Sequence, residues 1–78
     1  LDPYICPANV VTVGWGHALL DPQGRQIKPA THGGRVAALR AGADALTRLF
    51  GQPAISRDQA KALLAMDLNT FAAAVSQA

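Results

Sequence analysis

The sequence predicts an α+β fold, in which a small antiparallel sheet is followed by helices. The residues Val10-Val11-Thr12-Val13 form a β-branched run, which is typical of a half-buried strand. Two later segments, 36–50 and 60–75, repeat apolar residues at spacings of three and four, which indicates one apolar face on each of two helices. With 78 residues the chain makes one small domain at most. Half of its residues are apolar, which excludes a disordered chain.

A hairpin is predicted over residues 4–17. A turn at residues 7–9 leads into the strand at 10–13, and residues 15–20 are expected to pair back as a second strand. Glycines on both sides of Trp15 indicate a sharp bend where another backbone or a ligand comes close. The hairpin is expected to carry three polar side chains towards one place: Cys6, Thr12 and His17.

The segments around this hairpin are predicted to be short. Residues 1–6 are either the end of a helix or an extended segment, because two prolines prevent a continuous helix there. Residues 21–24 have Asp, Pro and Gly at the first, second and fourth positions of a β-turn. Residues 25–27 can add a short third strand, and residues 28–34 form a loop.

The first predicted helix ends at Gly51, where a left-handed cap belongs, and Pro53 prevents its continuation. Its interior Gly42 costs about 1 kcal/mol relative to alanine. The residues expected on its apolar face are Val36, Leu39, Ala43, Leu46 and Phe50. The residues expected to face water are Arg35, Arg40 and Arg48.

The second predicted helix begins at a capping box formed by Ser56 and Gln59. Asp58 in its first turn suits the positive end of the helix dipole. Its apolar stripe comprises Ala60, Leu63, Leu64, Leu68, Phe71 and Val75.

Asp67 is expected to lie inside this stripe. A carboxylate on a buried face is costly unless it is paired, and a buried Asp would hold His17 protonated. We therefore predict an ion pair between His17 and Asp67 that joins the hairpin to the second helix. The alternative is that Asp67 lies at the edge of the stripe and is solvated.

Composition excludes several classes of protein. The net charge of +2 and the dispersed arginines, with no interleaved aromatic residues, do not indicate nucleic-acid binding. A mild positive field would help the chain to bind an anionic polymer, although ordinary solubility charge is the simpler explanation of the net charge. The single cysteine allows no internal disulfide. No signal peptide or membrane-spanning segment is predicted. The alanine-rich core, with four aromatics, predicts marginal stability or a partner surface.

Two sequence motifs resemble those of one known family. Five residues separate Cys6 from Thr12, and Gly14-Trp15-Gly16-His17 follows. This stretch resembles the active-site hairpin of bacteriophage-type lysozymes, the endolysins of glycoside hydrolase family 24. That family's motif is a Glu, eight residues, an Asp or Cys, five residues, a Thr and a Gly-x-Gly-His segment. Residues 55–67 are similar to the start of the family's long linking helix, including its Leu-Leu-x-x-Asp pattern. The match covers residues 4–20 and 54–75.

The resemblance implies an arrangement of domains and a substrate. Residues 1–53 would be a β-hairpin lobe with one helix, and residues 54–78 the start of the linking helix, with a second helical lobe missing. The substrate would be a peptidoglycan glycan strand, cleaved at its β-1,4 bonds by a bacteriolytic phage or prophage product that reaches the wall from the host cytoplasm. The partner would be the rest of the lysozyme domain or another copy of the chain.

The resemblance also implies roles for individual residues. The family's Glu is the general acid; it would lie four residues ahead of Leu1, and this chain contains no glutamate. We therefore expect the isolated chain to be an inactive fragment. Cys6 and Thr12 would position the water or steady the developing charge. A thiol is a poor base unless its pKa is lowered. The family's His and Asp at the equivalent places strengthen the predicted His17–Asp67 pair.

Simpler readings of these residues stay open. Cys6 is otherwise a small buried hydrophobe, and Thr12 a packing residue. Tyr4 and Trp15 are candidate sugar-stacking surfaces, or else core and rim packing. Asp2 is a rival carboxylate at the wrong spacing.

Other sites and functions are also considered. The glycines do not make a dinucleotide fingerprint, and the histidines and single cysteine lack zinc-ligand spacing, so no cofactor or metal is expected. A nucleophilic Cys6–His17 pair would need the two side chains within hydrogen-bond reach. A different class of function is a non-catalytic module for cell-wall binding or interaction, and a third is a structural domain whose motif overlap is accidental. A Glu-Gly just upstream would favour the enzyme.

Overall fold

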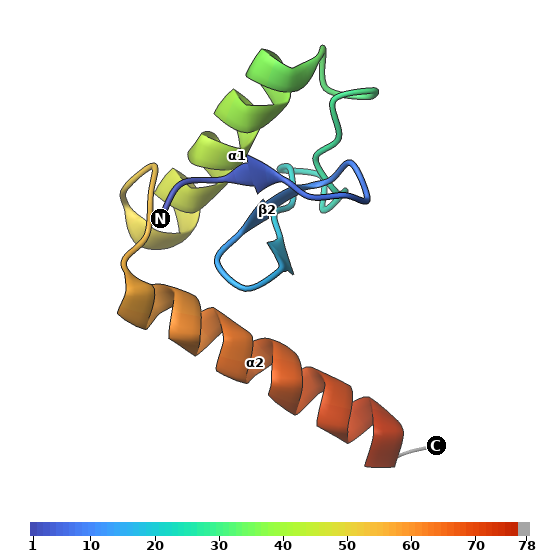
Figure 1. The fold of residues 1–78 in the computed structure, drawn as a ribbon, viewed down its shortest axis with the longest axis vertical. Coiled ribbons are helices and arrows are strands. Elements are labelled where there is room, and N and C mark those ends of the chain that lie inside the picture. Colours follow the sequence, from blue (N-terminus) through green and yellow to red (C-terminus); the bar gives the residue numbers. More distant parts are fainter. Residues whose placement is uncertain (77–78) are drawn as a thin grey trace.

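The computed structural model describes the backbone of residues 1–76 and the side chains of residues 1–70. Its elements are β1 (Tyr4–Ile5), β2 (Val11–Val13), β3 (His17–Ala18), α1 (Arg35–Phe50) and α2 (Arg57–Ser76). The three strands form one antiparallel sheet in the order β1-β2-β3, and the helices follow it in the sequence (Figure 1). The predicted α+β fold class is therefore confirmed.

The hairpin between β1 and β2 has a three-residue loop at residues 7–9. The Cys6 N–H donates to the Val10 carbonyl at 3.0 Å, and the Asn9 N–H donates to the Cys6 carbonyl at 2.8 Å. Asn9 closes the turn with a φ of 63°, a left-handed conformation that asparagine tolerates better than most residues. The predicted turn is confirmed, and residues 4–5 of the ambiguous first segment form a strand.

The hairpin between β2 and β3 places Thr12 opposite Ala18 and Val13 opposite His17. Its turn meets α2, because a Cβ at Gly14 would lie 3.0 Å from the Ala60 Cβ. The close approach expected at this bend is therefore made by a helix. The second strand is shorter than the predicted residues 15–20.

The prediction of a short third strand at residues 25–27 is wrong. Only a single bridge forms, between Leu20 and Gln26, and the Ile27 carbonyl accepts the Val11 N–H at 2.8 Å. The chain leaves the sheet there because the next turn starts at once: the Lys28 carbonyl accepts the N–H groups of residues 31 and 32. The predicted turn at residues 21–24 is confirmed by a 2.9 Å bond between its ends.

Helix α1 packs directly on β2. A Cβ at Gly42 would lie only 2.5 Å from Val11 Cγ1, so the helix backbone approaches the strand too closely for any side chain at this position. The buried face of α1 consists of Ala38, Gly42, Ala45 and Leu46. Val36, predicted on this face, is wrong: it is 72% exposed, because the close approach turns the small residues of the helix towards the sheet.

The predicted helix ends are correct. Gly51 adopts a φ of 78° and its N–H donates to the Thr47 carbonyl, so the left-handed cap of α1 is confirmed. The Ser56 N–H donates to Gln59 Oε1 at 2.9 Å, and the Gln59 N–H donates to Ser56 Oγ at 3.1 Å, which confirms the capping box of α2. The three arginines expected to face water are exposed: Arg35, Arg40 and Arg48.

Only the first turns of α2 are packed into the core. Ala60 and Leu63 are buried and Leu64 is half-buried, but Leu68 is 57% exposed, so the predicted stripe is wrong at that position. The later turns of α2 extend away from α1 (Figure 1). The predicted stripe residues Phe71 and Val75 lie outside the described side chains. Over the described residues, neither helix has the combination of length and apolar character needed to cross a membrane.

Candidate functional site

Cys6 and Thr12 lie on the same face of the ribbon formed by β1 and β2. Tyr4 pairs with Thr12, and the Cys6 N–H bonds to Val10, so strand alternation directs residues 4, 6, 10 and 12 to one side. Val11, on the opposite side, packs against α1. The thiol and the hydroxyl selected from the sequence are therefore neighbours on the face away from α1.

The Thr12 side chain is fixed by its backbone surroundings. It is 3% exposed, and its hydroxyl donates to the Val10 carbonyl at 2.9 Å. A hydroxyl has a single proton and two acceptor lone pairs. That proton can be donated to one acceptor at a time, either the Val10 carbonyl or the Cys6 sulfur, while the lone pairs remain available to accept a hydrogen bond from a water molecule.

The Cys6 thiol is half-buried and free. The Thr12 hydroxyl is the largest influence that lowers the pKa of Cys6, the Val10 backbone is the second of the lowering influences, and partial burial opposes them. Hydrogen bonds to the thiolate favour the charged form. A thiol with a lowered pKa can take part in chemistry, so Cys6 is not limited to the role of a small apolar side chain.

Tyr4 and Trp15 present exposed aromatic surface on β1 and on the turn after β2. Tyr4 is 42% exposed, and its hydroxyl donates to the Gly14 carbonyl at 3.3 Å, which connects β1 to the turn after β2. Trp15 is 53% exposed on that same turn. Both rings are accessible, and their role in stacking on sugar stays a prediction.

His17 and Asp67 are brought together by the packing of β3 against α2. His17 Nδ1 lies 3.0 Å from Asp67 Oδ2 and 3.2 Å from Oδ1. The side chains are 26% and 46% exposed, so the expectation that Asp67 is buried is wrong. Exposed ion pairs contribute only about 0–1 kcal/mol to stability. The partner of His17 is Asp67, and the described hydrogen bonds include none between His17 and Cys6.

A family model described as phage lysozyme matches residues 1–78 of the chain. The chain belongs to the phage lysozyme family. At the level of the family, its function is that of a lysozyme-type peptidoglycan hydrolase, a glycoside hydrolase. The comparisons with curated proteins and with solved structures gave no match.

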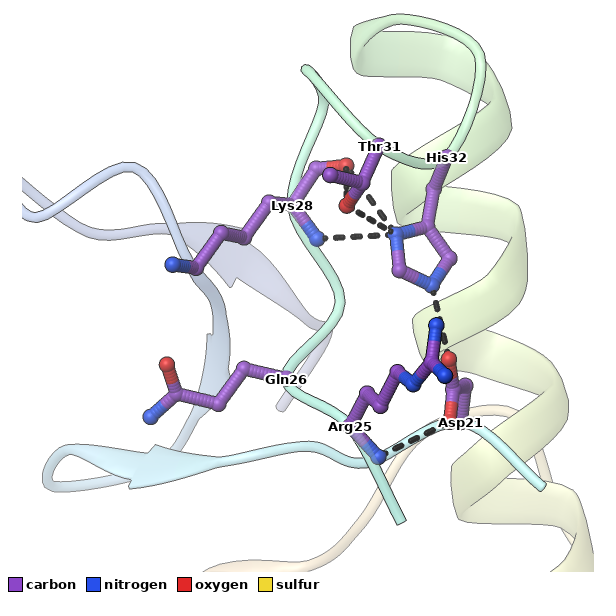
Figure 2. Close-up of a pocket in the computed structure, with 6 residues that line it drawn as sticks. All are labelled: Asp21, Arg25, Gln26, Lys28, Thr31 and His32. Carbon is purple, nitrogen blue, oxygen red and sulfur yellow. Dashed lines mark hydrogen bonds and ion pairs between the residues drawn. The ribbon is translucent and has the colours of Figure 1, made fainter. Parts of the chain in front are cut away.

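This phage lysozyme chain also contains a second histidine–aspartate pair, which sequence reasoning missed. His32 Nε2 lies 3.1 Å from Asp21 Oδ2, and Asp21 Oδ1 accepts the Arg25 N–H at 2.9 Å (Figure 2). The same carboxylate oxygen accepts the Gln23 N–H at 3.0 Å. The Arg25 N–H is the largest cause of a lowered pKa at Asp21; partial burial opposes it, and His32 lowers it further. The sequence does indicate the hydrogen bonds from backbone N–H groups to Asp21, because Asp at the first position of a turn commonly accepts them. The sequence spacing does not indicate the contact with His32, which lies on the next loop.

Two pockets lie outside the ribbon face of this phage lysozyme chain. One, of about 330 Å³, is lined by residues of the turn and loop that carry the second pair (Figure 2). The other, of about 380 Å³, lies between the segment 17–22 and α1. The described residues include no group of three or more His, Cys, Asp or Glu placed to hold a metal ion.

Proposed function

We propose that this chain contributes part of the active site of a muramidase, which cleaves the β-1,4 bond between N-acetylmuramic acid and N-acetylglucosamine in the bacterial cell wall. The observation that carries the proposal is the adjacent thiol and hydroxyl of Cys6 and Thr12 on one ribbon face, with the thiol pKa lowered by that hydroxyl. Membership of the phage lysozyme family supports it.

Glycoside hydrolysis needs an acid that protonates the leaving oxygen and a second group that activates water or stabilises the sugar cation. Thr12, held by its bond to Val10, would accept a hydrogen bond from the attacking water. The Cys6 sulfur would accept a hydrogen bond from that water or stabilise positive charge on the sugar. The sequence contains no glutamate. In this proposal the acid is therefore a glutamate outside residues 1–78.

The exposed aromatic residues fit a role in binding the glycan. Tyr4, on β1, and Trp15, on the turn after β2, present exposed ring surface on which the apolar faces of sugar rings can stack. In this arrangement residues 1–53 form the substrate-binding lobe, and residues 54–78 begin the helix that links it to a second lobe.

Titration of the chain with a chitooligosaccharide tests the binding half of the proposal. NMR spectra of the backbone amides should show saturable changes at residues 4, 6, 12 and 15, and Trp15→Ala should weaken binding by about tenfold. Leu49→Ala is the matched control, because Leu49 is also an exposed apolar side chain, on α1. Changes spread evenly over the surface, or equal effects of the two variants, would contradict a sugar-binding ribbon face.

A lysis assay tests the catalytic half. The isolated 78-residue chain should not clear a suspension of chloroformed Gram-negative cells, because it holds no glutamate. A chain extended to a complete domain, with a glutamate nine positions before Cys6, should clear it, and the Glu→Gln version should not. If the isolated chain cleared the suspension, the proposal that the general acid lies outside residues 1–78 would be wrong.

The absence of glutamate also favours a second candidate, a non-catalytic wall-binding or interaction module. In that case the oligosaccharide titration would succeed while the extended chain remained inactive. The two experiments together therefore separate the enzyme from the binding module.

A further inference from the structure

The pocket of about 330 Å³ is built by a connected set of hydrogen bonds. His32 is the centre of this set: its Nε2 faces Asp21 at 3.1 Å, and its Nδ1 lies 2.8 Å from Thr31 Oγ1 and 3.2 Å from the Lys28 N–H, which donates to it. The Asp21 and His32 side chains are only 11% and 18% exposed. These bonds join the turn at residues 21–25 to the loop at residues 28–32, so the wall of the pocket is preorganised.

Asp21 does not present a free negative charge to this pocket. One of its oxygens accepts two backbone N–H groups, and the other faces His32. Hydrogen bonding and ion pairing of this kind stabilise a carboxylate in place. Asp21 lines the pocket, and its charge is used to hold the loop against the turn.

The remaining polar lining consists of hydrogen-bond donors. Arg25 and Lys28 line the pocket, and within the described chain neither forms an ion pair. The Gln26 side chain adds an amide. Figure 2 shows Lys28 and Gln26 extending to the same side of the loop, while the Arg25 guanidinium reaches towards His32. Two cations and an amide donor therefore line one concave surface.

We propose that this pocket binds a compact oxyanion, a phosphate or carboxylate group carried by a larger molecule. Guanidinium and ammonium groups form charge-assisted hydrogen bonds to such oxygens. The volume is at the lower end of the range for small-molecule sites, enough for an anionic group and part of its carrier. The pocket shares no residue with the ribbon face, so this site is separate from the proposed hydrolysis.

The alternative use of the same residues is a catalytic relay from Thr31 through His32 to Asp21. His32 Nδ1 lies 3.2 Å from both the N–H and the carbonyl oxygen of Lys28, as well as 2.8 Å from Thr31 Oγ1, so it is not reserved for the Thr31 proton. The contacts of His32 with Lys28 and Asp21 hold the loop against the turn, which favours a positioning role for His32.

Titration with small anions at neutral pH tests the proposal. Inorganic phosphate and sodium acetate are added to the 78-residue chain at constant ionic strength, with chloride as the reference, and backbone amide NMR signals are followed. The expected result is saturable change confined to residues 21–32, with phosphate or with acetate. The preferred anion then identifies the chemistry of the carrier.

The double substitution Arg25→Gln and Lys28→Gln should weaken binding by about tenfold or more, because hydrogen bonds to charged groups are lost. The matched control is Arg57→Gln with Lys61→Gln, which removes the same charge from exposed positions of α2. Changes that do not saturate with either anion, or equal losses in the two double variants, would overturn the proposal. Failure of the lysozyme assays would not affect this test, since the probes contain no sugar.

Discussion

At the scale of single residues, the functional argument depends on one hydroxyl. Thr12→Val keeps the shape of the side chain but removes the donor that lowers the pKa of Cys6. The pKa of the thiol should therefore rise, and alkylation of Cys6 by iodoacetamide should become slower at a fixed neutral pH. The pH dependence of the alkylation rate measures this pKa directly. Thr12→Ser keeps the hydroxyl and should retain the lowered pKa; an unchanged midpoint in Thr12→Val would refute the role of Thr12.

Asp21 gives a prediction with a definite pH dependence. Its pKa is lowered in the folded chain, so its ionised form stabilises the fold. That stabilisation is present above the unfolded pKa of about 3.9 and is lost as the pH falls through the folded value. Asp21→Asn should therefore melt at a lower temperature than the parent chain at pH 7, and the difference should shrink in acid. Asp44→Asn, at an exposed position of α1, controls for the loss of one charge; a difference independent of pH would contradict the prediction.

At the scale of elements, Gly42 shows why a residue that weakens a helix is present. Gly42→Ala should gain about 1 kcal/mol in helix propensity. The new methyl group would overlap Val11 Cγ1 at 2.5 Å, on a buried and stiff β-branched side chain, and such overpacking costs about 1–3 kcal/mol. Net destabilisation is therefore expected in urea denaturation.

A double-mutant cycle with Val11→Ala checks the cause of that loss. The Val11 methyl groups are absent in the double variant, so the two changes together should cost less than the sum of the single changes. Strict additivity would show that the close approach of α1 and β2 is not the source.

The buried face of α1 can also be tested through two leucines of the same helix. Leu46 is fully buried, whereas Leu49 is 62% exposed. Leu46→Ala should lower the free energy of unfolding by about 2–5 kcal/mol, and Leu49→Ala should change it by less than about 0.5 kcal/mol. Equal effects in denaturant titrations would contradict the observed orientation of α1.

The two helices and the turn at residues 21–24 show what the sequence can and cannot predict. Local signals were sufficient at residues whose neighbours in the chain decide their structure: the Gly51 cap, the Ser56–Gln59 capping box and the turn at residues 21–24. Val36 was misplaced because helix periodicity does not show that small residues allow α1 to approach β2 closely. Asp67 was expected to be buried because periodicity does not show where a helix leaves the lobe.

At the scale of the whole molecule, the candidate site depends on how segments far apart in the chain meet. The motif placed Cys6 and Thr12 on one ribbon, where a local register decides their positions. The Asp21–His32 pair comes from two loops whose meeting is set by the bonds of Ile27 to Val11 and Leu19, and no local pattern encodes that contact. The catalytic roles of the motif residues stay predictions.

The connection between the lobe and the later turns of α2 gives the last prediction. Among the described side chains beyond Leu64, the His17–Asp67 pair links the two, at 3.0 Å and open to solvent. A double-mutant cycle with His17→Ala and Asp67→Ala, measured by denaturation at pH 6 and low salt, should give a coupling of about 0.2–1 kcal/mol that decreases when salt is added. A coupling of several kcal/mol that persists in salt would show that the pair is shielded from water. The small value expected means that the pair orients α2 against β3, while the core contacts of Ala60 and Leu63 hold the helix in place.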